Sequence, residues 1–267
     1  MSIQFDKVQP KTKEQLKQLI NYAFKHDIYD LNFIDTSKIT NMSWLFENVM
    51  HNFDVSNWDV SNVTYMNGIF NSCFKFKGKG LENWDVSNVT SMYSMFTACE
   101  NFEGKGLENW DVSKVKDMYS IFYGCKKLNC DLSNWDVSNV TDMSHMFYCC
   151  KNFDINCFKS WDVSNVENTS YMFYYCNNFD CDLSNWDVSN VTDMNSMFGF
   201  CNKFDCDLSY WDVSNVTDMY SMFTMCKNFK GKGLENWDVS KAEDIRYMFS
   251  GCDKMTIPNW YKLYHKK

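Results

Sequence analysis

The side chains that could do chemistry recur in columns, because the block Trp-Asp-Val-Ser is repeated eight times along the chain. The chain has 13 cysteines and four histidines among 267 residues. Thiols at this density could form disulfides, bind a metal or fill an apolar interior. One cysteine stands fifteen residues after the tryptophan of each block, and these form the cysteine column: Cys73, Cys99, Cys125, Cys150, Cys176, Cys201, Cys226 and Cys252.

The cysteine column is best explained as a series of small buried thiols. Equivalent residues on stacked repeats lie about 5 Å apart, a spacing at which a disulfide is geometrically allowed. The N-terminus lacks an export signal, which favours reduced thiols. Other cysteines form pairs with four intervening residues, such as Cys125 and Cys130, but zinc sites use tighter spacing with histidine partners. We therefore expect neither a metal nor a cofactor.

The blocks also place one aspartate in every repeat, which we call the aspartate column. Its carboxylates could form a stripe that binds cations. The alternative is that each aspartate, with the serine two residues later, accepts hydrogen bonds from turn amides. The sequence favours this second role. The column consists of Asp59, Asp85, Asp111, Asp136, Asp162, Asp187, Asp212 and Asp238.

Motifs for catalysis are not recognisable. The segments Gly78-Lys-Gly80 and Gly104-Lys-Gly106 resemble a phosphate-binding loop only superficially, because they lack its GxxxxGK[ST] spacing and lead toward an expected strand. The serines and histidines show no triad arrangement. The sequence therefore predicts a protein that is not an enzyme and has no catalytic residues.

The elements that position these columns follow from the repeat length. Tryptophans recur every 25 or 26 residues, a period typical of a solenoid in which one supersecondary unit stacks on its copies. Trp135, Asp136 and Val137 alternate as in a strand, and Met143, Met146, Phe147 and Cys150 have the spacing of a short helix. The tryptophan column, which we expect to be buried, is Trp58, Trp84, Trp110, Trp135, Trp161, Trp186, Trp211 and Trp237.

These patterns predict an α/β solenoid similar to leucine-rich repeats, with a short parallel strand and a short helical segment in each coil. Residues 1–33 are expected to form an N-terminal cap with a helix at about 13–26, introduced by a capping box at Thr12 and Gln15. Residues 34–252 would form about nine coils, of which the first is degenerate. Residues 253–267 would form a C-terminal cap.

Charge and hydropathy exclude two classes of partner. The net charge is −8 and Arg246 is the only arginine, so a basic stripe for nucleic acid is missing. Apolar runs are too short to span a membrane. With no signal peptide recognisable, we expect a cytoplasmic protein.

A recognition surface is expected where the repeats differ, because the constant columns are used for structure. The two positions after the core phenylalanine vary most, and aromatic residues gather there in neighbouring repeats. They could anchor a partner protein; alternatively, they pack between coils. The candidate contact residues are Tyr123, Tyr148, Tyr174, Tyr175 and Phe200.

The repeat resembles a known family. Leu132, Trp135 and Val137 occupy the apolar positions of the L-x-x-L-x-L pattern of leucine-rich repeats. The whole segment Trp-Asp-Val-Ser-Asn-Val-Thr-Asp-Met-x-x-Met-Phe-x-x-Cys resembles the DUF285, or BspA-like, repeat of bacterial surface proteins over about residues 8–260. This resemblance implies a leucine-rich-repeat-like solenoid and roles in adhesion or protein–protein contact. Many family members are exported, which departs from the cytoplasmic expectation.

Two functions follow as hypotheses. The first is a non-enzymatic solenoid that binds another protein. The second is a structural protein that packs side by side or end to end into larger arrays.

Overall fold

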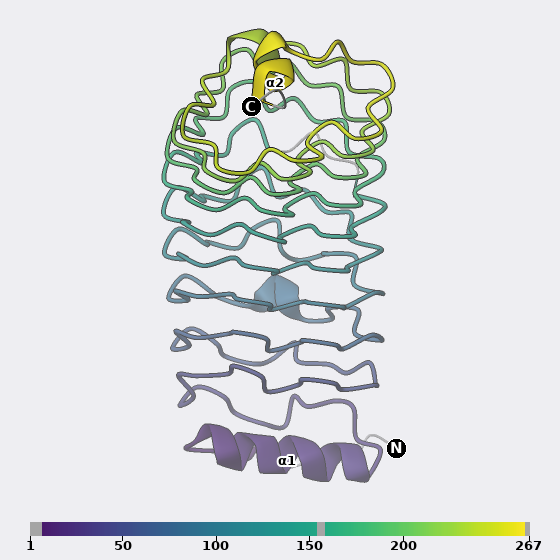
Figure 1. Ribbon diagram of the computed structural model, residues 1–267. Coiled ribbons are helices and arrows are strands. Elements are labelled where there is room, and N and C mark those ends of the chain that lie inside the picture. Colours follow the sequence, from purple (N-terminus) through teal and green to yellow (C-terminus); the bar gives the residue numbers. More distant parts are fainter. Residues whose placement is uncertain (1–6, 154–157, 265–267) are drawn as a thin grey trace.

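The described residues, 7–153 and 158–264, form a stack of similar coils in the computed structural model (Figure 1). The regular elements are few: α1 (Lys13–Lys25), the 3-10 helices η1 (Leu81–Asn83) and η2 (Leu234–Asn236), and α2 (Asn259–Tyr264). Figure 1 shows α1 below the first coils and α2 at the opposite end of the stack. The protein is therefore a repeat solenoid that carries a helix at either end.

Helix α1 covers the first coil with one apolar face. Leu16, Ile20 and Ala23 are buried and belong to the same core as the coils. The Thr12 hydroxyl accepts the amide of Gln15, and the Gln15 side chain accepts the amide of Lys11. The Gln15 side chain thus bonds the amide of Lys11, one residue before the expected partner Thr12. Together the two bonds satisfy amide groups at the start of the helix that have no partner within it.

The core is one continuous column of apolar side chains inside the coils. All eight repeat tryptophans are buried, with at most 6 % of their surface exposed. Nine phenylalanine rings stack along the axis with centroids 5.4–5.9 Å apart, from Phe46 to Phe249. A coil alone would expose these rings on two sides, so each coil is stabilised by its neighbours.

The predicted helical segment in each coil is wrong. Residues 143–150 form successive turns in which the amides of Met146 and Cys150 bond the carbonyls of Met143 and Phe147, three residues back. Alternate amides instead donate to the next coil, as from His145 to Ser170. His145 and Cys149 have φ of 57° and 60°, in the left-handed region, which interrupts a helix twice per coil. The spacing of three that suggested a helix belongs to consecutive turns.

The predicted strand at Trp135–Val137 is also wrong. Parallel pairing in the described coils is limited to isolated bridges. Apart from Val8–Ile34 and Asp30–Asp54 near the N-terminal end, these join equivalent residues of successive coils, as between Asp117 and Asp142. The amides of Trp135 and Val140 close turns onto Leu132 and Val137, so they do not pair with the neighbouring coil. We call the equivalent bridged positions of successive coils the bridge column: Asn41, Tyr65, Ser91, Asp117, Asp142, Asn168, Asp193, Asp218 and Asp244.

The C-terminal end continues the pattern of the repeats. Trp260 of α2 donates its indole N–H to the carbonyl of Leu234 at 2.7 Å, as a repeat tryptophan would. Its neighbour Tyr261 contacts the last stacked ring, Phe249, edge to face. Within the described residues, no helix is long and apolar enough to cross a membrane.

Candidate interaction surface

The tryptophan and cysteine columns use their polar atoms to join the coils. Each repeat indole donates to a backbone carbonyl of the preceding coil at 2.8–3.3 Å, as from Trp135 to Leu107. Each thiol of the cysteine column donates to the carbonyl of the core phenylalanine on the preceding coil at 2.9–3.1 Å, as from Cys125 to Phe96. The twelve described cysteines are free thiols, and Cys157 lies outside the described residues. These atoms are occupied by structural hydrogen bonds.

Carboxylates of the aspartate column close turns. In every repeat, one carboxylate oxygen accepts the backbone amide of the serine two residues later, as from Ser138 to Asp136 at 3.1 Å. The hydroxyl of this serine and then its amide stabilise the charged carboxylate and lower the pKa of Asp111 and Asp162. The described residues contain no group of three or more histidine, cysteine or acidic side chains that could hold a metal ion.

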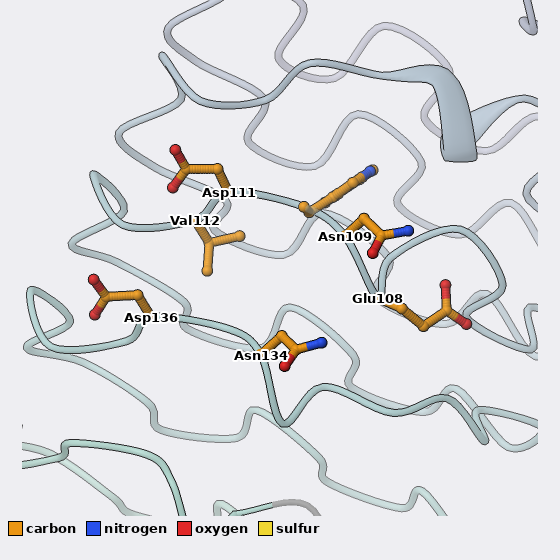
Figure 2. A pocket seen from close by; sticks show the side chains of 7 residues that line it. Glu108, Asn109, Asp111, Val112, Asn134 and Asp136 are labelled. Atoms are coloured by element: carbon orange, nitrogen blue, oxygen red, sulfur yellow. The ribbon is translucent and has the colours of Figure 1, made fainter.

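A shallow hollow of about 340 Å³ opens beside this column. Figure 2 shows Asp111 and Asp136 at its edge, one coil apart, with Glu108 at the other side. Its apolar lining comes from Trp110 and Val112, which are buried in the core. The seven lining residues include three carboxylates and two asparagines but no serine, cysteine or histidine.

The variable positions after the core phenylalanine form an aromatic surface outside the core. Tyr123 stacks on Tyr148 with centroids 4.4 Å apart, and Tyr148 lies 5.2 Å from Tyr174. Tyr175 stacks on Phe200 at 4.3 Å. All five candidate contact residues are only partly exposed, yet none belongs to the buried core. The structure thus brings the predicted contact residues together as two stacks, which meet where Tyr174 contacts Tyr175 and Phe200 edge to face.

Sequence analysis missed four rings of this surface, because they lie in different columns, one or two residues after the first core methionine. Tyr93 stacks on Tyr119 at 4.9 Å, and His145 joins the two rows through contacts with Tyr119, Tyr148 and Tyr171. The sequence did contain a signal for these four rings, because successive repeats carry Tyr93, Tyr119, His145 and Tyr171 in these columns. We call the combined surface the aromatic face: Tyr93, Tyr119, Tyr123, His145, Tyr148, Tyr171, Tyr174, Tyr175 and Phe200.

Several rings of the aromatic face are held on strained backbone. His145, Tyr171, Tyr175 and Phe200 have φ between 56° and 63°. The equivalent positions of other coils hold small residues such as Ser120, Ala98 and Gly124 as well as large ones such as Trp44, Met225 and Tyr247, and glycine adopts this conformation most easily. Any residue with a Cβ atom there costs about 1 kcal/mol or more. The aromatic side chains at these four positions therefore stand on backbone that glycine alone adopts without this cost.

The polar groups of the aromatic face are not fully satisfied. His145 Nδ1 and Asn195 Oδ1 are the buried side-chain atoms without a hydrogen-bond partner in the described part of the chain. Burial disfavours the charged imidazole and lowers the pKa of His145. Burial against neighbouring phenols raises the pKa of Tyr148. Both shifts favour the uncharged ring at neutral pH, so His145 and Tyr148 present apolar rings with polar edges.

The bridge column places carboxylates along the edge of the aromatic face. Oδ1 of Asp117 accepts the amide of Tyr119 at 3.0 Å, and Oδ1 of Asp142 accepts the amide of Ser144 at 2.8 Å. Burial, together with the carboxylate one coil away, raises the pKa of Asp117 and Asp193. Asn168 interrupts the charges and makes the same amide contact, to Ser170.

Comparison with protein families identifies the repeat. A model described as "Mycoplasma protein of unknown function, DUF285" matches residues 14–105, 69–159 and 154–260, which together cover most of the chain. The chain belongs to the DUF285 family. The three matched ranges of this DUF285 chain include all eight repeat tryptophans, whereas the aromatic face lies at positions that vary from coil to coil. A comparison with curated proteins gave no match.

Two solved structures match this DUF285 chain at low identity. One is a leucine-rich-repeat protein of Leptospira interrogans, with 13 % identity over 87 % of this chain and 63 % of that chain, at a TM-score of 0.30. The other is a TLR13–ssRNA13 complex, with 11 % identity over 93 % of this chain and 48 % of that chain, at a TM-score of 0.29. The chain spans less than two thirds of each, and at these TM-scores neither bears on its function.

Proposed function

We propose that the protein is a non-enzymatic solenoid that binds another protein through the aromatic face. The observation that carries this proposal is the concentration of nine partly exposed rings on neighbouring coils, outside the core, with several on strained backbone. Tyrosines are enriched at protein interfaces because a ring buries a large apolar area while its hydroxyl remains hydrogen-bonded. Family membership supports the same class of function, since leucine-rich-repeat-like solenoids present extended binding surfaces.

End-to-end assembly is the competing hypothesis, and the ends of the stack argue against it. Helix α1 buries Leu16, Ile20 and Ala23 against the first coil, and Trp260 and Tyr261 contact the last. A solenoid whose ends are covered in this way does not offer its stacking faces to another copy. Sedimentation at increasing concentration checks this: growing particles would favour assembly.

The interaction is tested by removing two rings of the aromatic face. Immobilised wild-type chain and the variant Tyr148→Ala with Tyr174→Ala are exposed to lysate of the source organism, and retained proteins are quantified by mass spectrometry. Tyr210→Ala is the matched control, because Tyr210 is 82 % exposed and lies outside the aromatic face. We expect the double variant, but not the control, to lose a specific retained protein.

The double variant must also remain folded for the result to be interpretable. Tyr148 and Tyr174 lie outside the buried core, so we expect unfolding in urea to stay cooperative, with a midpoint close to that of the wild type. A collapse in stability would instead show that these rings serve inter-coil packing. Equal retention by wild type and folded double variant would contradict the proposed surface.

A further inference from the structure

The last coil shows how one charged group binds beside the aromatic face. The guanidinium of Arg246 donates from Nε to both carboxylate oxygens of Asp244, at 3.0 and 3.1 Å, and also donates from Nη2. Its central carbon lies 5.7 Å from the centroid of the Tyr220 ring on the preceding coil. A bridge-column carboxylate and a tyrosine one coil below thus hold a guanidinium by ion pairing and cation–π contact together.

The same pair of groups recurs in the middle of the stack without an arginine. Asp142 occupies the bridge column there, and Tyr119 is the tyrosine on the preceding coil. The residue equivalent to Arg246 is Ser144, whose short hydroxyl turns back to Oδ1 of Asp142. No cation from the described residues pairs with Asp142, and no described hydrogen bond reaches its Oδ2. The chain therefore repeats the carboxylate–tyrosine pair but leaves out the guanidinium.

Other carboxylates of the bridge column lack a cation as well. Among the described residues, Asp117, Asp193 and Asp218 form no ion pair with lysine or arginine. The described lysine ion pairs are made by other columns, such as Lys159 with Asp182 and Lys232 with Asp207. Partly buried like charges one coil apart disfavour ionisation, as the raised pKa of Asp117 and Asp193 indicates. Cationic groups from outside would relieve this cost.

We propose that the aromatic face and the adjoining bridge column bind an extended, arginine-containing segment of a partner protein. This proposal rests on the proposed function and specifies its partner chemistry. Arginine fits better than lysine, because its planar guanidinium can pair with a carboxylate and lie on a ring at once. The negative charge of the whole chain draws a basic segment toward this surface.

The spacing of the bridge column sets the length of the partner segment that can cover it. Asp117 and Asp218 are separated by four steps of the bridge column, which is about 19 Å at the spacing of paired strands. An extended peptide covers that distance with about six residues. A peptide of eight residues that alternates arginine with glycine therefore reaches from Asp117 to Asp218, with several guanidinium groups available to the carboxylates between them.

The test measures binding of this labelled peptide to the full chain by fluorescence anisotropy. Matched peptides replace arginine with lysine or with glutamate. We expect the arginine peptide to bind at least about fivefold more tightly than the lysine peptide, a difference of about 1 kcal/mol. We expect no binding of the glutamate peptide.

Two pairs of substitutions locate the site. Asp142→Asn with Asp193→Asn removes two bridge-column charges, and Asn168 shows that asparagine keeps the amide contact of this column. We expect about a fivefold or larger loss of affinity for the arginine peptide. The control pair is Asp136→Asn with Asp187→Asn, which removes equal charge from the aspartate column while keeping an acceptor for each serine amide. We expect less than about a twofold change for the control.

Three results would overturn the proposal: no binding of the arginine peptide, equal binding of arginine and lysine peptides, or equal loss in both pairs of variants. Equal loss would mean that the net charge of the chain attracts the peptide without a defined site. The proposed function is judged by a separate result, the loss of the protein that the immobilised chain retains from lysate. If that protein is lost with Tyr148→Ala and Tyr174→Ala but not with Asp142→Asn and Asp193→Asn, the aromatic face binds a partner that is not recognised through arginine.

Discussion

The ring of Tyr174 lies directly over Gly199 of the next coil. A Cβ atom added at residue 199 would stand 2.5 Å from Cε2 of Tyr174, too close for any real contact. The backbone of Gly199 does not have a positive φ, so its conformation does not require glycine. The absence of a side chain at residue 199 is what allows Tyr174 to lie flat along the aromatic face.

We expect Gly199→Ala to lower the free energy of unfolding by about 1–3 kcal/mol, because the added methyl group displaces the ring. In the Tyr174→Ala background the same change should cost much less. Urea unfolding of the two single variants and the double variant measures this coupling. Equal cost in both backgrounds would mean that Gly199 is needed for a reason unrelated to Tyr174.

Trp135→Ala should cost at least about 3 kcal/mol, because it leaves a large cavity between coils. Trp135→Phe keeps a smaller aromatic ring but removes the indole donor to Leu107, whose carbonyl then accepts only the amide of Trp110. We expect a loss of about 1–3 kcal/mol for this second variant. Urea unfolding separates burial from hydrogen bonding, and a loss below about 1 kcal/mol for Trp135→Ala would place the ring in solvent.

Cys149 and Cys150 are adjacent but should differ in reactivity. Cys150 is fully buried and donates to Phe122, whereas Cys149 is partly exposed beside the aromatic face. Burial raises the pKa of both thiols, and that of Cys150 is raised well above its ordinary value. Only the thiolate is alkylated readily. Mass spectrometry after brief iodoacetamide treatment of the folded chain should find Cys149 modified first, and equal rates would contradict this arrangement.

Acid should destabilise the chain partly through His145. Its pKa is lowered from 6.5 because burial disfavours the imidazolium, so the unfolded chain binds this proton more readily. The contribution of the neutral imidazole is complete above about pH 6.5 and is lost as the pH falls through the lowered folded pKa. His145→Tyr should reduce the fall in Tm between pH 7 and pH 5, since Tyr171 already occupies the equivalent position one coil later with the same backbone conformation. An unchanged pH profile would exclude His145 as the cause.

Asp193→Asn should raise Tm slightly at pH 7, by a value on the order of 1–2 °C. The pKa of Asp193 is raised by burial and by the charges of Asp218 and Asp142, so its ionised form costs stability above that pKa. The gain should disappear toward pH 3.8, where the aspartate itself becomes protonated. A lower Tm for the variant at pH 7 would show that the charge stabilises the fold, contrary to the inference that it serves binding.

The sequence by itself determined the period, the stacking and the buried columns. Trp135, Phe147 and Cys150 recur at fixed places in every repeat, and apolar side chains repeated in this way are expected to be buried between coils. The turn role of Asp136 and Ser138 was also readable, because a carboxylate two residues before a serine amide is a local arrangement. The helix expected at about residues 13–26 is α1, Lys13–Lys25, because its capping and apolar spacing are likewise local.

Only the tertiary structure decided the conformation inside each coil and the extent of the aromatic face. Spacings of three are shared by helices and consecutive turns, and the choice depends on whether alternate amides find carbonyls on the next coil, as His145 does at Ser170. Tyr119 and Tyr148 lie in different columns, and His145 links them only because adjacent coils stack in register. The period predicts that equivalent residues about 25 positions apart lie on neighbouring coils, but contacts between different columns depend on how the coils are offset, which only the tertiary structure shows.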